Sequence, residues 1–183
     1  MPADPIRKEP RYCWMANAIL LALVTGQRRE DVSAMTFDQA KDGFLWIEQK
    51  KTGAKLLIPM TLRLDAIGMS VADVLKQCRD SVISKRVIHF VRANSGRKPG
   101  DSPSLNTLSA AFAEFRDLAK IQVSDGKTPS SFHEIRSLPV RLYTDQYGPD
   151  FAQALTGHRS ASMTALYRDS RGREWSEATL RKG

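Results

Sequence analysis

Six polar side chains have the types that phosphoryl transfer on a nucleic-acid backbone requires. Attack at the phosphorus of a phosphodiester spreads negative charge over its oxygens, and two guanidiniums can donate planar forks of hydrogen bonds to those oxygens. A histidine can add a hydrogen bond, and a lysine can protonate the leaving alkoxide. A second histidine can help to remove the proton of a tyrosine nucleophile. The residues that could fill these roles are Arg28, Lys51, His133, Arg136, His158 and Tyr167.

Most of these side chains also have an ordinary structural explanation. Arg28 could pair with Asp31 on its own helix, and Lys51 could be a solvated turn residue. His133 could be a surface residue and Arg136 could pair with a carboxylate, because exposed charges usually need no further explanation. His133 and Arg136 are nevertheless three residues apart, which places both on one face of a helix.

Tyr167 lies in the stretch "ALTGHRSASMTALYRDS", whose pattern favours a helix. It could pack against Met163 one turn earlier, because a free phenol with a pKa near 10 is only about one part in a thousand ionised at pH 7. A nucleophilic role would therefore require activating groups elsewhere in the chain. His158, directly after Gly157, is a candidate for one of them.

Hydrophobic periodicity and capping signals predict a mostly helical chain. Gly26 is placed to end the first helix, and Pro149 suits the first turn of a later helix that ends at Gly157. Ser131 and Glu134 form a capping box that predicts another helix start. The predicted helices cover 11–25, 28–35, a segment after the Ser70–Asp73 capping box marked by Val71, Val74, Leu75, Cys78 and Val82, 105–120, a segment opened by Ser131, a segment from Pro149 to Gly157, and a last one that carries Tyr167.

A β-hairpin is predicted at 43–60, where two β-prone runs flank a turn near 50–53. The hairpin could continue into a small sheet with the run "VIHFV" at 87–91. Loops are predicted at 92–104, which is basic, and at 122–130. The resulting fold class is α+β, mostly α: a helical domain with a small antiparallel sheet or hairpin.

Composition narrows the class of partner. The chain has 183 residues and a net charge of +8, from 28 Lys and Arg against 20 Asp and Glu, which suggests a polyanion partner. Its longest apolar stretch, at 18–24, is too short for a membrane span. Cys13 and Cys78 show neither a CxxC pattern nor zinc spacing, so no disulfide framework or zinc site is expected. The scattered carboxylates are not assignable to the divalent-metal site of a ribonuclease-H-type DNA transferase.

Five spaced segments carry the candidate residues: "LVTGQRRED", "EQKKTGAKLLIP", "SSFHEIRSL", "LTGHRS" and "LYRDSRGREW". Their order and spacing resemble those of the tyrosine recombinases, in particular the lambda-type phage integrases. The resemblance extends from about residue 12 to the tail, and five spaced segments are far more specific than one motif. It implies the tyrosine recombinase fold, which is like that of type IB topoisomerases, and DNA cleavage and rejoining without a metal, a cofactor or ATP.

The resemblance also implies roles for the candidates in the first two segments. Arg28 resembles the first catalytic arginine of the family, and Asp31 matches the acidic residue that supports this arginine. Lys51 resembles the hairpin lysine that protonates the 5′-oxygen. Its neighbour Lys50 is the alternative for that role.

The remaining segments supply the other groups that the family uses. His133 and Arg136 match its HxxR box, and His158 matches its second histidine, which follows a glycine. Tyr167 matches the nucleophile that forms a 3′-phosphotyrosine link, which conserves bond energy. Further DNA contacts are expected at Arg29, Arg97 and Lys98.

The activity implied is site-specific recombination for phage integration and excision, in the cytoplasm of a bacterial host and associated with its nucleoid. The partners implied are double-stranded DNA attachment sites, a homotetramer of the full-length protein that exchanges strands through a Holliday junction, and DNA-bending accessory proteins; no membrane is involved. Two alternatives remain open. The chain could be a non-catalytic DNA-binding relative, although the complete set of candidates argues against this, or a type IB topoisomerase-like enzyme that relaxes DNA.

The expected domain organisation follows from the same resemblance. Residues 1–11 are interpreted as the remnant of an interdomain linker, 12–169 as the catalytic domain, and 170–183 as a tail that could dock on a neighbouring protomer. Pro139 departs from the expected pattern. It follows His133 by six residues, and proline there removes a backbone donor and is expected to kink the helix.

Overall fold

The helices and strands form a mostly helical domain with a small sheet, which confirms the predicted fold class. The computed structural model describes residues 13–93, 96–120, 123, 126–157 and 176–178. Its helices are α1 (Cys13–Thr25), α2 (Arg29–Ala34), α3 (Val71–Cys78), α4 (Leu105–Leu118), α5 (Ser137–Tyr147) and α6 (Pro149–Leu155), with the short 3-10 helices η2 (Phe37–Gln39), η3 (Asp65–Ile67) and η4 (Phe132–Arg136). Its strands are β1 (Ala40–Lys41), β2 (Phe44–Glu48), β3 (Lys55–Pro59), β4 (Arg63–Leu64), β5 (Met69–Ser70) and β6 (Ser176–Glu177).

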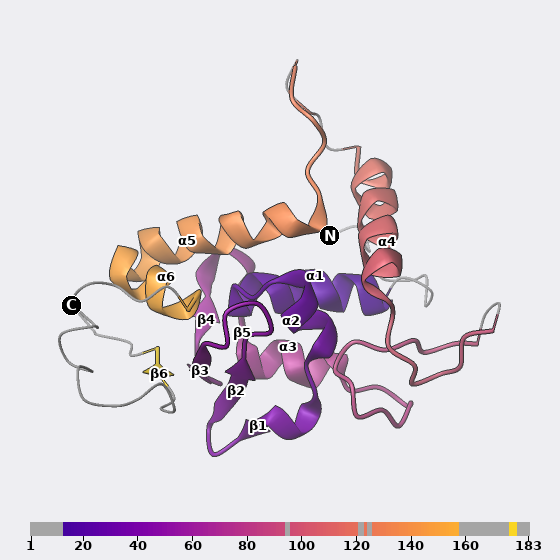
Figure 1. Ribbon diagram of the computed structural model, residues 1–183, viewed down its shortest axis with the longest axis horizontal. Helices are drawn as coiled ribbons and strands as arrows, with labels where there is room; N and C mark the ends of the chain where they lie inside the picture. The colour runs from indigo at the N-terminus through magenta and orange to yellow at the C-terminus, as the bar shows by residue number, and fades with distance from the viewer. Residues whose placement is uncertain (1–12, 94–95, 121–122, 124–125, 158–175, 179–183) are drawn as a thin grey trace.

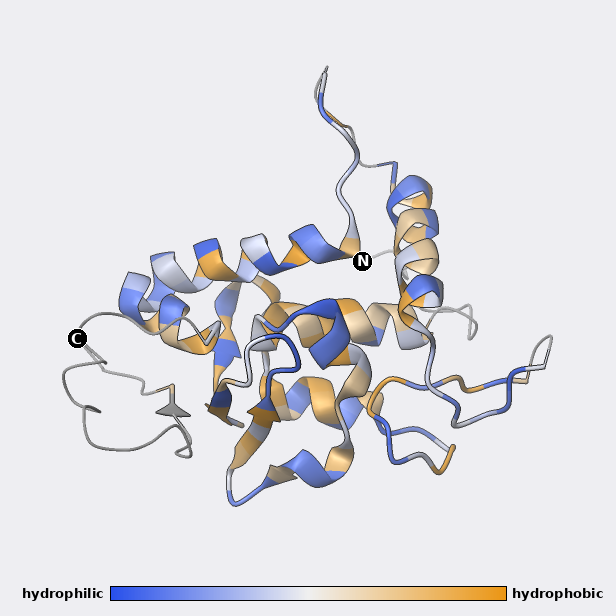
Figure 2. Cartoon of the chain, viewed as in Figure 1, coloured by the Kyte–Doolittle hydropathy of each residue, from blue (hydrophilic) through white to orange (hydrophobic). Residues whose placement is uncertain are grey.

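Helix α1 lies at the centre of the fold. Seven of its 13 residues are buried, which is typical of a helix that other elements surround. It contacts α2, α3, α4, α5 and η4, and Figure 1 shows it between α5 on one side and α2 and α3 on the other. Figure 2 shows hydrophobic residues concentrated along α1, whereas α5 and α6 alternate hydrophobic and hydrophilic residues. None of the helices in the described part of the chain is long and apolar enough to cross a membrane.

Strands β2 and β3 form the predicted hairpin. Leu45 pairs with Ile58 and Ile47 pairs with Leu56, and these four side chains are buried. The residues between them are only half-buried, as expected when one face of a pleated strand packs on the core. This packing fixes the register of the hairpin, and with it the turn that carries Lys51.

Further strands extend the hairpin into a four-stranded sheet with the order β1-β2-β3-β6. Strand β6 runs parallel to β3 and pairs Leu57 with Glu177. Ala178 is buried, and its N–H donates to the Leu57 carbonyl oxygen at 3.1 Å. Residues 176–178 of the tail therefore lie on the hairpin of their own chain. Docking of the tail on a neighbouring protomer stays a prediction.

The run at 87–91 is not a strand of the sheet, so that prediction was wrong. Residues 87–90 are all buried, without the alternation of a half-buried strand. The Val87 N–H donates to the Met35 carbonyl oxygen, just after α2, at 3.0 Å. Nδ1 of His89 lies 2.9 Å from the Arg86 carbonyl oxygen, and its Nε2 lies 3.3 Å from Oδ1 of Asp80. The run packs as a buried loop because the loop and the end of α2 supply these hydrogen bonds.

The helix predicted at Ser131 begins as η4 and continues as α5. The predicted capping box of Ser131 and Glu134 is present. Residues at i and i+3 of a 3-10 helix share a face, so the spacing of His133 and Arg136 still places them on one side. Pro139 is the third residue of α5, where an N–H has no intrahelical acceptor. The irregularity therefore falls at the change from 3-10 to α-helix, before the proline.

Other predicted helix boundaries agree with the structure to within a few residues. Pro149 is the first residue of α6, and Gly157 follows the end of α6 with a φ of 72°. The Ser70–Asp73 capping box opens α3, but that helix ends at Cys78, and Val82 lies beyond it.

The last carbonyl groups of an α-helix have no N–H donor within the helix. At the end of α1, side chains donate hydrogen bonds to these carbonyl groups. Oγ1 of Thr25 donates to the Leu21 carbonyl oxygen at 2.6 Å. The hydroxyl of Tyr143 on α5 donates to the Val24 carbonyl oxygen at 2.8 Å, and the tyrosine is fully buried. These bonds fix the end of α1 immediately before Arg28.

Replacing Tyr143 by phenylalanine is expected to lower the free energy of unfolding by about 1–2 kcal/mol, because it leaves the buried Val24 carbonyl group without this donor. Urea denaturation measures the change. Tyr147→Phe is the matched control, since Tyr147 stacks on Tyr143 at 6.0 Å between ring centroids. An equal loss in both variants would show that the Tyr143 hydroxyl has no special role.

Candidate active site

Arg28 is the N-cap residue of α2 and is half-buried. Its Nη1 donates a hydrogen bond to Oε1 of Gln49, at 3.1 Å. Within the described residues it forms no ion pair with Asp31. Oδ1 of Asp31 instead accepts the Lys50 N–H at 2.9 Å. Arg28 is therefore held by a neutral amide and not by a carboxylate.

Arg136, at the end of η4, is held in a similar way. Its Nη2 donates to the carbonyl oxygen of Thr156, just after α6, at 2.5 Å. Its Nη1 is buried and has no hydrogen-bond partner among the residues that the structure describes. Burial and the positive charge of Arg28 together lower the pKa of Arg136 to about 10. A guanidinium with this pKa remains charged at pH 7, with donor capacity to spare.

The two guanidiniums create a site whose positive charge is only partly offset. In the described part of the chain, neither Arg28 nor Arg136 forms an ion pair. Asp31 interacts electrostatically with both arginines, and its buried Oδ2 has no hydrogen-bond partner among the described residues. Burial raises the pKa of Asp31, against the opposing effects of the Lys50 N–H and the two arginines. An anion with several oxygens would complete this arrangement.

Two buried glutamines connect the elements that meet here. Gln27 and Gln49 are each 1% exposed, and Nε2 of Gln49 donates to Oε1 of Gln27 at 2.7 Å. The same Nε2 donates to the Thr156 carbonyl oxygen at 3.1 Å. Nε2 of Gln27 donates to the carbonyl oxygens of Thr25 and Leu155, both at 2.9 Å. Neither glutamine was predicted from the sequence, although each adjoins a predicted site residue.

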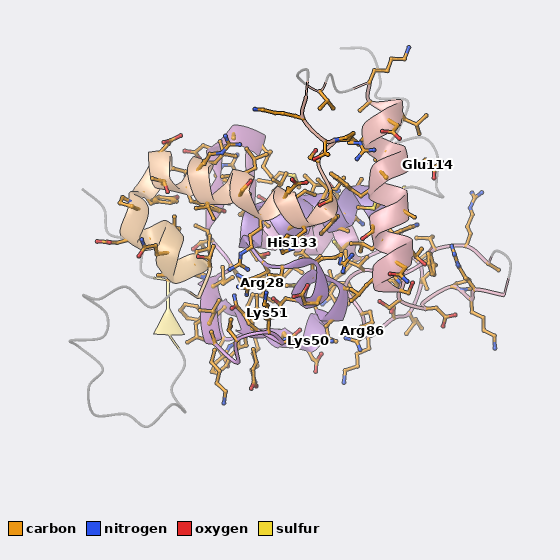
Figure 3. All side chains as sticks on the ribbon, turned by 45° about the horizontal axis from the view of Figure 1, so that its top comes forward. Arg28, Lys50, Lys51, Arg86, Glu114 and His133 are labelled. Atoms are coloured by element: carbon orange, nitrogen blue, oxygen red, sulfur yellow. The ribbon has the colours of Figure 1, made fainter. Side chains whose placement is uncertain are left out.

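Lys51 and Lys50 lie in the hairpin turn with exposed side chains. Two hydrogen bonds hold the turn in place. The Lys50 N–H donates to Oδ1 of Asp31, and Oγ1 of Thr52 donates to Oε1 of Gln49 at 2.7 Å. Figure 3 shows Lys51 next to Arg28, with Lys50 farther along the turn. The turn thus presents two exposed ammonium groups on a hydrogen-bonded backbone.

His133 is exposed on η4, the element that also carries Arg136. In the view of Figure 3 it projects between α5 and the hairpin, on the side where Arg28 lies. The predicted positions of Arg28, Lys51, His133 and Arg136 therefore converge on one region. His158 and Tyr167 lie outside the described residues.

Arg97 and Lys98, two of the expected outer DNA contacts, lie apart from this region. The guanidinium of Arg97 lies over the ring of Phe90, 5.1 Å from its centroid, and Lys98 is exposed in the same loop. Figure 1 shows this loop on the opposite side of the molecule from α6. Arg29 donates through Nη1 to Oγ of Ser109 and so joins α2 to α4. Within the described residues, no group of three or more His, Cys, Asp and Glu side chains could hold a metal ion.

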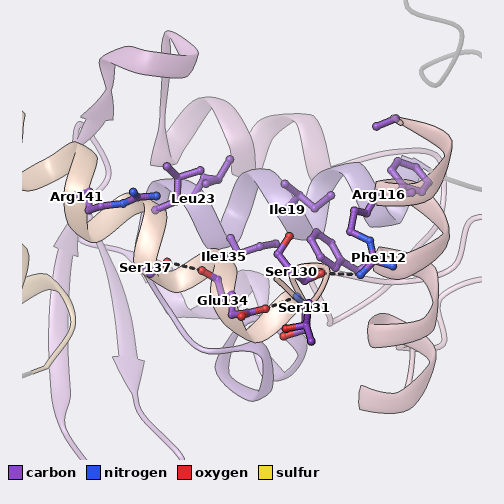
Figure 4. A pocket seen from close by; sticks show the side chains of 14 residues that line it. Ile19, Leu23, Phe112, Arg116, Ser130, Ser131, Glu134, Ile135, Ser137 and Arg141 are labelled. Atoms are coloured by element: carbon purple, nitrogen blue, oxygen red, sulfur yellow. Dashed lines mark hydrogen bonds between the residues drawn. The ribbon is translucent and has the colours of Figure 1, made fainter. Parts of the chain in front are cut away.

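A cavity of about 460 Å³ lies behind η4, between α1, α4 and α5. Figure 4 shows Ile19 and Leu23 of α1 on one wall and Phe112 of α4 on another. Glu134 and Ile135 line it from η4, whereas His133 and Arg136 do not. The cavity is therefore separate from the cationic site.

Replacing Asp31 by asparagine is expected to change how stability depends on pH. Burial raises the pKa of Asp31, so the folded protein binds this proton more tightly than the unfolded chain does. The resulting stabilisation is present at low pH and is lost as pH rises through the raised pKa. Relative to Asp31→Asn, the wild type should therefore lose unfolding free energy as pH rises above the usual titration range of an aspartate, measured in urea.

Asp73→Asn is the control with the opposite sign. The Ser70 N–H lowers the pKa of Asp73, so its stabilisation appears as pH rises and is lost as pH falls through the lowered pKa. A pH-independent difference between the wild type and Asp31→Asn would contradict the expectation for Asp31.

Comparisons with known proteins, by sequence and by structure, agree on one family. The model of the phage integrase family matches residues 3–174. Prophage integrase IntE of Escherichia coli (strain K12) is 46% identical over 167 residues, which cover 91% of this chain and 44% of that protein. The chain thus spans less than half the length of this relative.

Solved structures extend the similarity to three dimensions. The lambda integrase catalytic core is 38% identical with a TM-score of 0.71, over 80% of this chain and 84% of that chain. A lambda integrase tetramer bound to a Holliday junction is 38% identical with a TM-score of 0.70, over 81% of this chain and 41% of that chain. With a family model that matches nearly its whole length, this chain belongs to the phage integrase family.

Proposed function

We propose that this chain is the catalytic domain of a site-specific DNA recombinase that cleaves and rejoins DNA through a 3′-phosphotyrosine intermediate. The observation that carries the proposal is the pair of guanidiniums of Arg28 and Arg136. They come from different elements, and their described hydrogen-bond acceptors are a neutral amide and a peptide carbonyl group. A DNA phosphodiester supplies the anionic oxygens that this site lacks, and membership of the phage integrase family supports that assignment.

The arginines and His133 would stabilise the charge that develops during cleavage. Arg28 and Arg136 donate to the non-bridging oxygens of the phosphate, and His133 adds a donor from the same face as Arg136. These contacts strengthen as phosphorus becomes five-coordinate, because more charge then lies on the equatorial oxygens. Asp31 supports the site by holding the Lys50 N–H and by offsetting part of the positive charge.

Tyr167, Lys51 and His158 would move the atoms and protons. The Tyr167 oxygen attacks phosphorus and forms an O–P bond, while the bond from phosphorus to the 5′-oxygen breaks. His158 accepts the phenolic proton, and Lys51 gives a proton to the departing 5′-oxygen. Rejoining reverses these steps when a 5′-hydroxyl attacks the phosphotyrosine. One phosphodiester is exchanged for another, so no ATP is consumed.

The proposed biological role is phage integration and excision at double-stranded DNA attachment sites. A lambda integrase tetramer has been solved on a Holliday junction, and an equivalent homotetramer is proposed for the full-length protein. DNA-bending accessory proteins would assist it in the bacterial cytoplasm, at the nucleoid. Residues 12–169 form the catalytic domain in this proposal, with 1–11 as a linker and 170–183 as the tail.

Covalent capture of DNA tests the proposal. Nicked suicide duplexes with attachment sites of related integrases lose a short 5′-hydroxyl fragment after cleavage, which traps the phosphotyrosine. The wild type is expected to form an adduct that is stable on a denaturing gel. Tyr167→Phe should form none, and Tyr147→Phe, on α5, should behave like the wild type.

Each other outcome excludes a part of the proposal. DNA binding without any wild-type adduct would favour a non-catalytic relative, and an adduct from Tyr167→Phe would exclude this nucleophile. Relaxation of supercoiled DNA by the full-length protein without recombination of paired sites would favour a topoisomerase-like enzyme.

Sulfur substitution at the 5′-bridging position tests the role of Lys51. Lys51→Ala is expected to slow cleavage of ordinary DNA by about 100-fold or more, as for loss of a general acid. A 5′-bridging sulfur should restore the rate, because a thiol of pKa about 8.5 leaves as a thiolate without a proton. Single-turnover adduct formation measures both rates.

Lys50→Ala is the matched control, one residue away in the same turn. It should retain a near wild-type rate on both substrates. A slow reaction that sulfur restores in Lys50→Ala, and not in Lys51→Ala, would assign the acid to Lys50.

A further inference from the structure

We propose that Gln27 and Gln49 form a positioning device for the reaction. Their paired side-chain amides set the separation of Arg28 and Arg136 while leaving both positive charges free for a phosphate. This inference rests on the proposed recombinase function. It assigns a role to two residues that contribute no charge, acid or nucleophile of their own.

The Gln49 amide uses all of its hydrogen-bonding groups. Oε1 accepts from Nη1 of Arg28 and Oγ1 of Thr52, and Nε2 donates to Oε1 of Gln27 and the Thr156 carbonyl oxygen. A 180° flip of the amide would direct its NH₂ group at the Arg28 donor. It would also direct its oxygen at two acceptors. The buried amide therefore has one favourable orientation.

The same amide links the two arginines through a short chain of contacts. The Thr156 carbonyl oxygen accepts from Nε2 of Gln49 at 3.1 Å and from Nη2 of Arg136 at 2.5 Å. Arg28 and Arg136 are thus connected through one side chain and one carbonyl group. Because Gln27 binds both Gln49 and the Leu155 carbonyl oxygen, the ends of α1, β2 and α6 are held together at this point.

Gly157 fits around this amide. A Cβ at position 157 would lie 2.8 Å from Oε1 of Gln49, which is too close for a side chain. Its φ of 72° also favours glycine. The backbone that leads to His158 therefore starts in contact with the amide that holds Arg28.

The neutrality of the amide is essential to this role. A carboxylate at position 49 could still accept from Arg28, but it would neutralise the charge that the phosphate requires. It would also lose the Nε2 donor to Gln27 and Thr156. An amide positions the guanidinium through a dipole and leaves its net charge available.

Gln49→Met tests the positioning role, because methionine has a similar length and no amide. The rate of suicide-substrate cleavage is expected to fall by about 10- to 100-fold, as for a displacement of about 1 Å in a reactive site. The Kd for the same DNA should change by less than about threefold, since both arginines keep their charge. Gln146→Met is the matched control: Gln146 also joins two elements, through the Asp65 N–H and the Arg63 carbonyl oxygen.

Gln49→Glu tests the need for neutrality. It should slow cleavage and also weaken DNA binding by about tenfold, the size expected when one charge-assisted contact is lost. Thermal unfolding of each variant gives the folded fraction, and rates are expressed per folded molecule at a temperature where all variants are folded. A variant that does not fold at any temperature is replaced by Gln27→Met, which leaves the Arg28 contact in place and should slow cleavage less than tenfold.

Three outcomes would overturn the inference. Gln49→Met could cleave at the wild-type rate, Gln146→Met could lose as much rate as Gln49→Met, or Gln49→Glu could bind and cleave DNA like the wild type. Absence of an adduct from the wild type would instead contradict the proposed function. The two failures are therefore distinguishable.

Discussion

The close approach of two half-buried guanidiniums is the constraint on which the rest of the site depends. Burial and the charge of Arg28 together lower the pKa of Arg136 to about 10, so holding the two positive charges close together carries an electrostatic cost. The fold offsets part of this cost with the amide of Gln49, the carbonyl group of Thr156 and the nearby Asp31. A fuller neutralisation would remove the reason for an anion to bind.

Central helix α1 supplies the rigidity that this arrangement requires. Its last carbonyl groups are bonded by Tyr143 of α5, by Thr25 and by Gln27, so the chain leaves the helix in a fixed direction. Arg28 follows directly, and Arg136 precedes the helix that carries Tyr143. The contacts that stabilise the core therefore also set the relative positions of the two arginines, because the same backbone segments serve both purposes.

Local signals explain why much of this was predictable. Two β-prone runs flank the turn of the hairpin, and the Ser131–Glu134 capping box identifies the start of the element that carries Arg136. Contacts between residues far apart in the sequence left weaker signals in it. Gln49 contacts Gln27 and Thr156, which are 22 and 107 positions away, and no periodicity links such residues. The buried run at 87–91 was misassigned because β-prone composition does not show whether a partner strand is within reach.

The residues beside the motifs help to build the site, together with the motif residues themselves. Gln27 precedes Arg28, Gln49 precedes the lysine pair, and Gly157 precedes His158, so each of these residues adjoins a candidate site residue. In the structure all three meet around one amide group. A phosphate site needs charged groups at fixed separations, and like charges do not hold one another in place. A buried, uncharged and fully hydrogen-bonded residue can fix those separations without neutralising the charges, and this is the environment that Gln49 occupies.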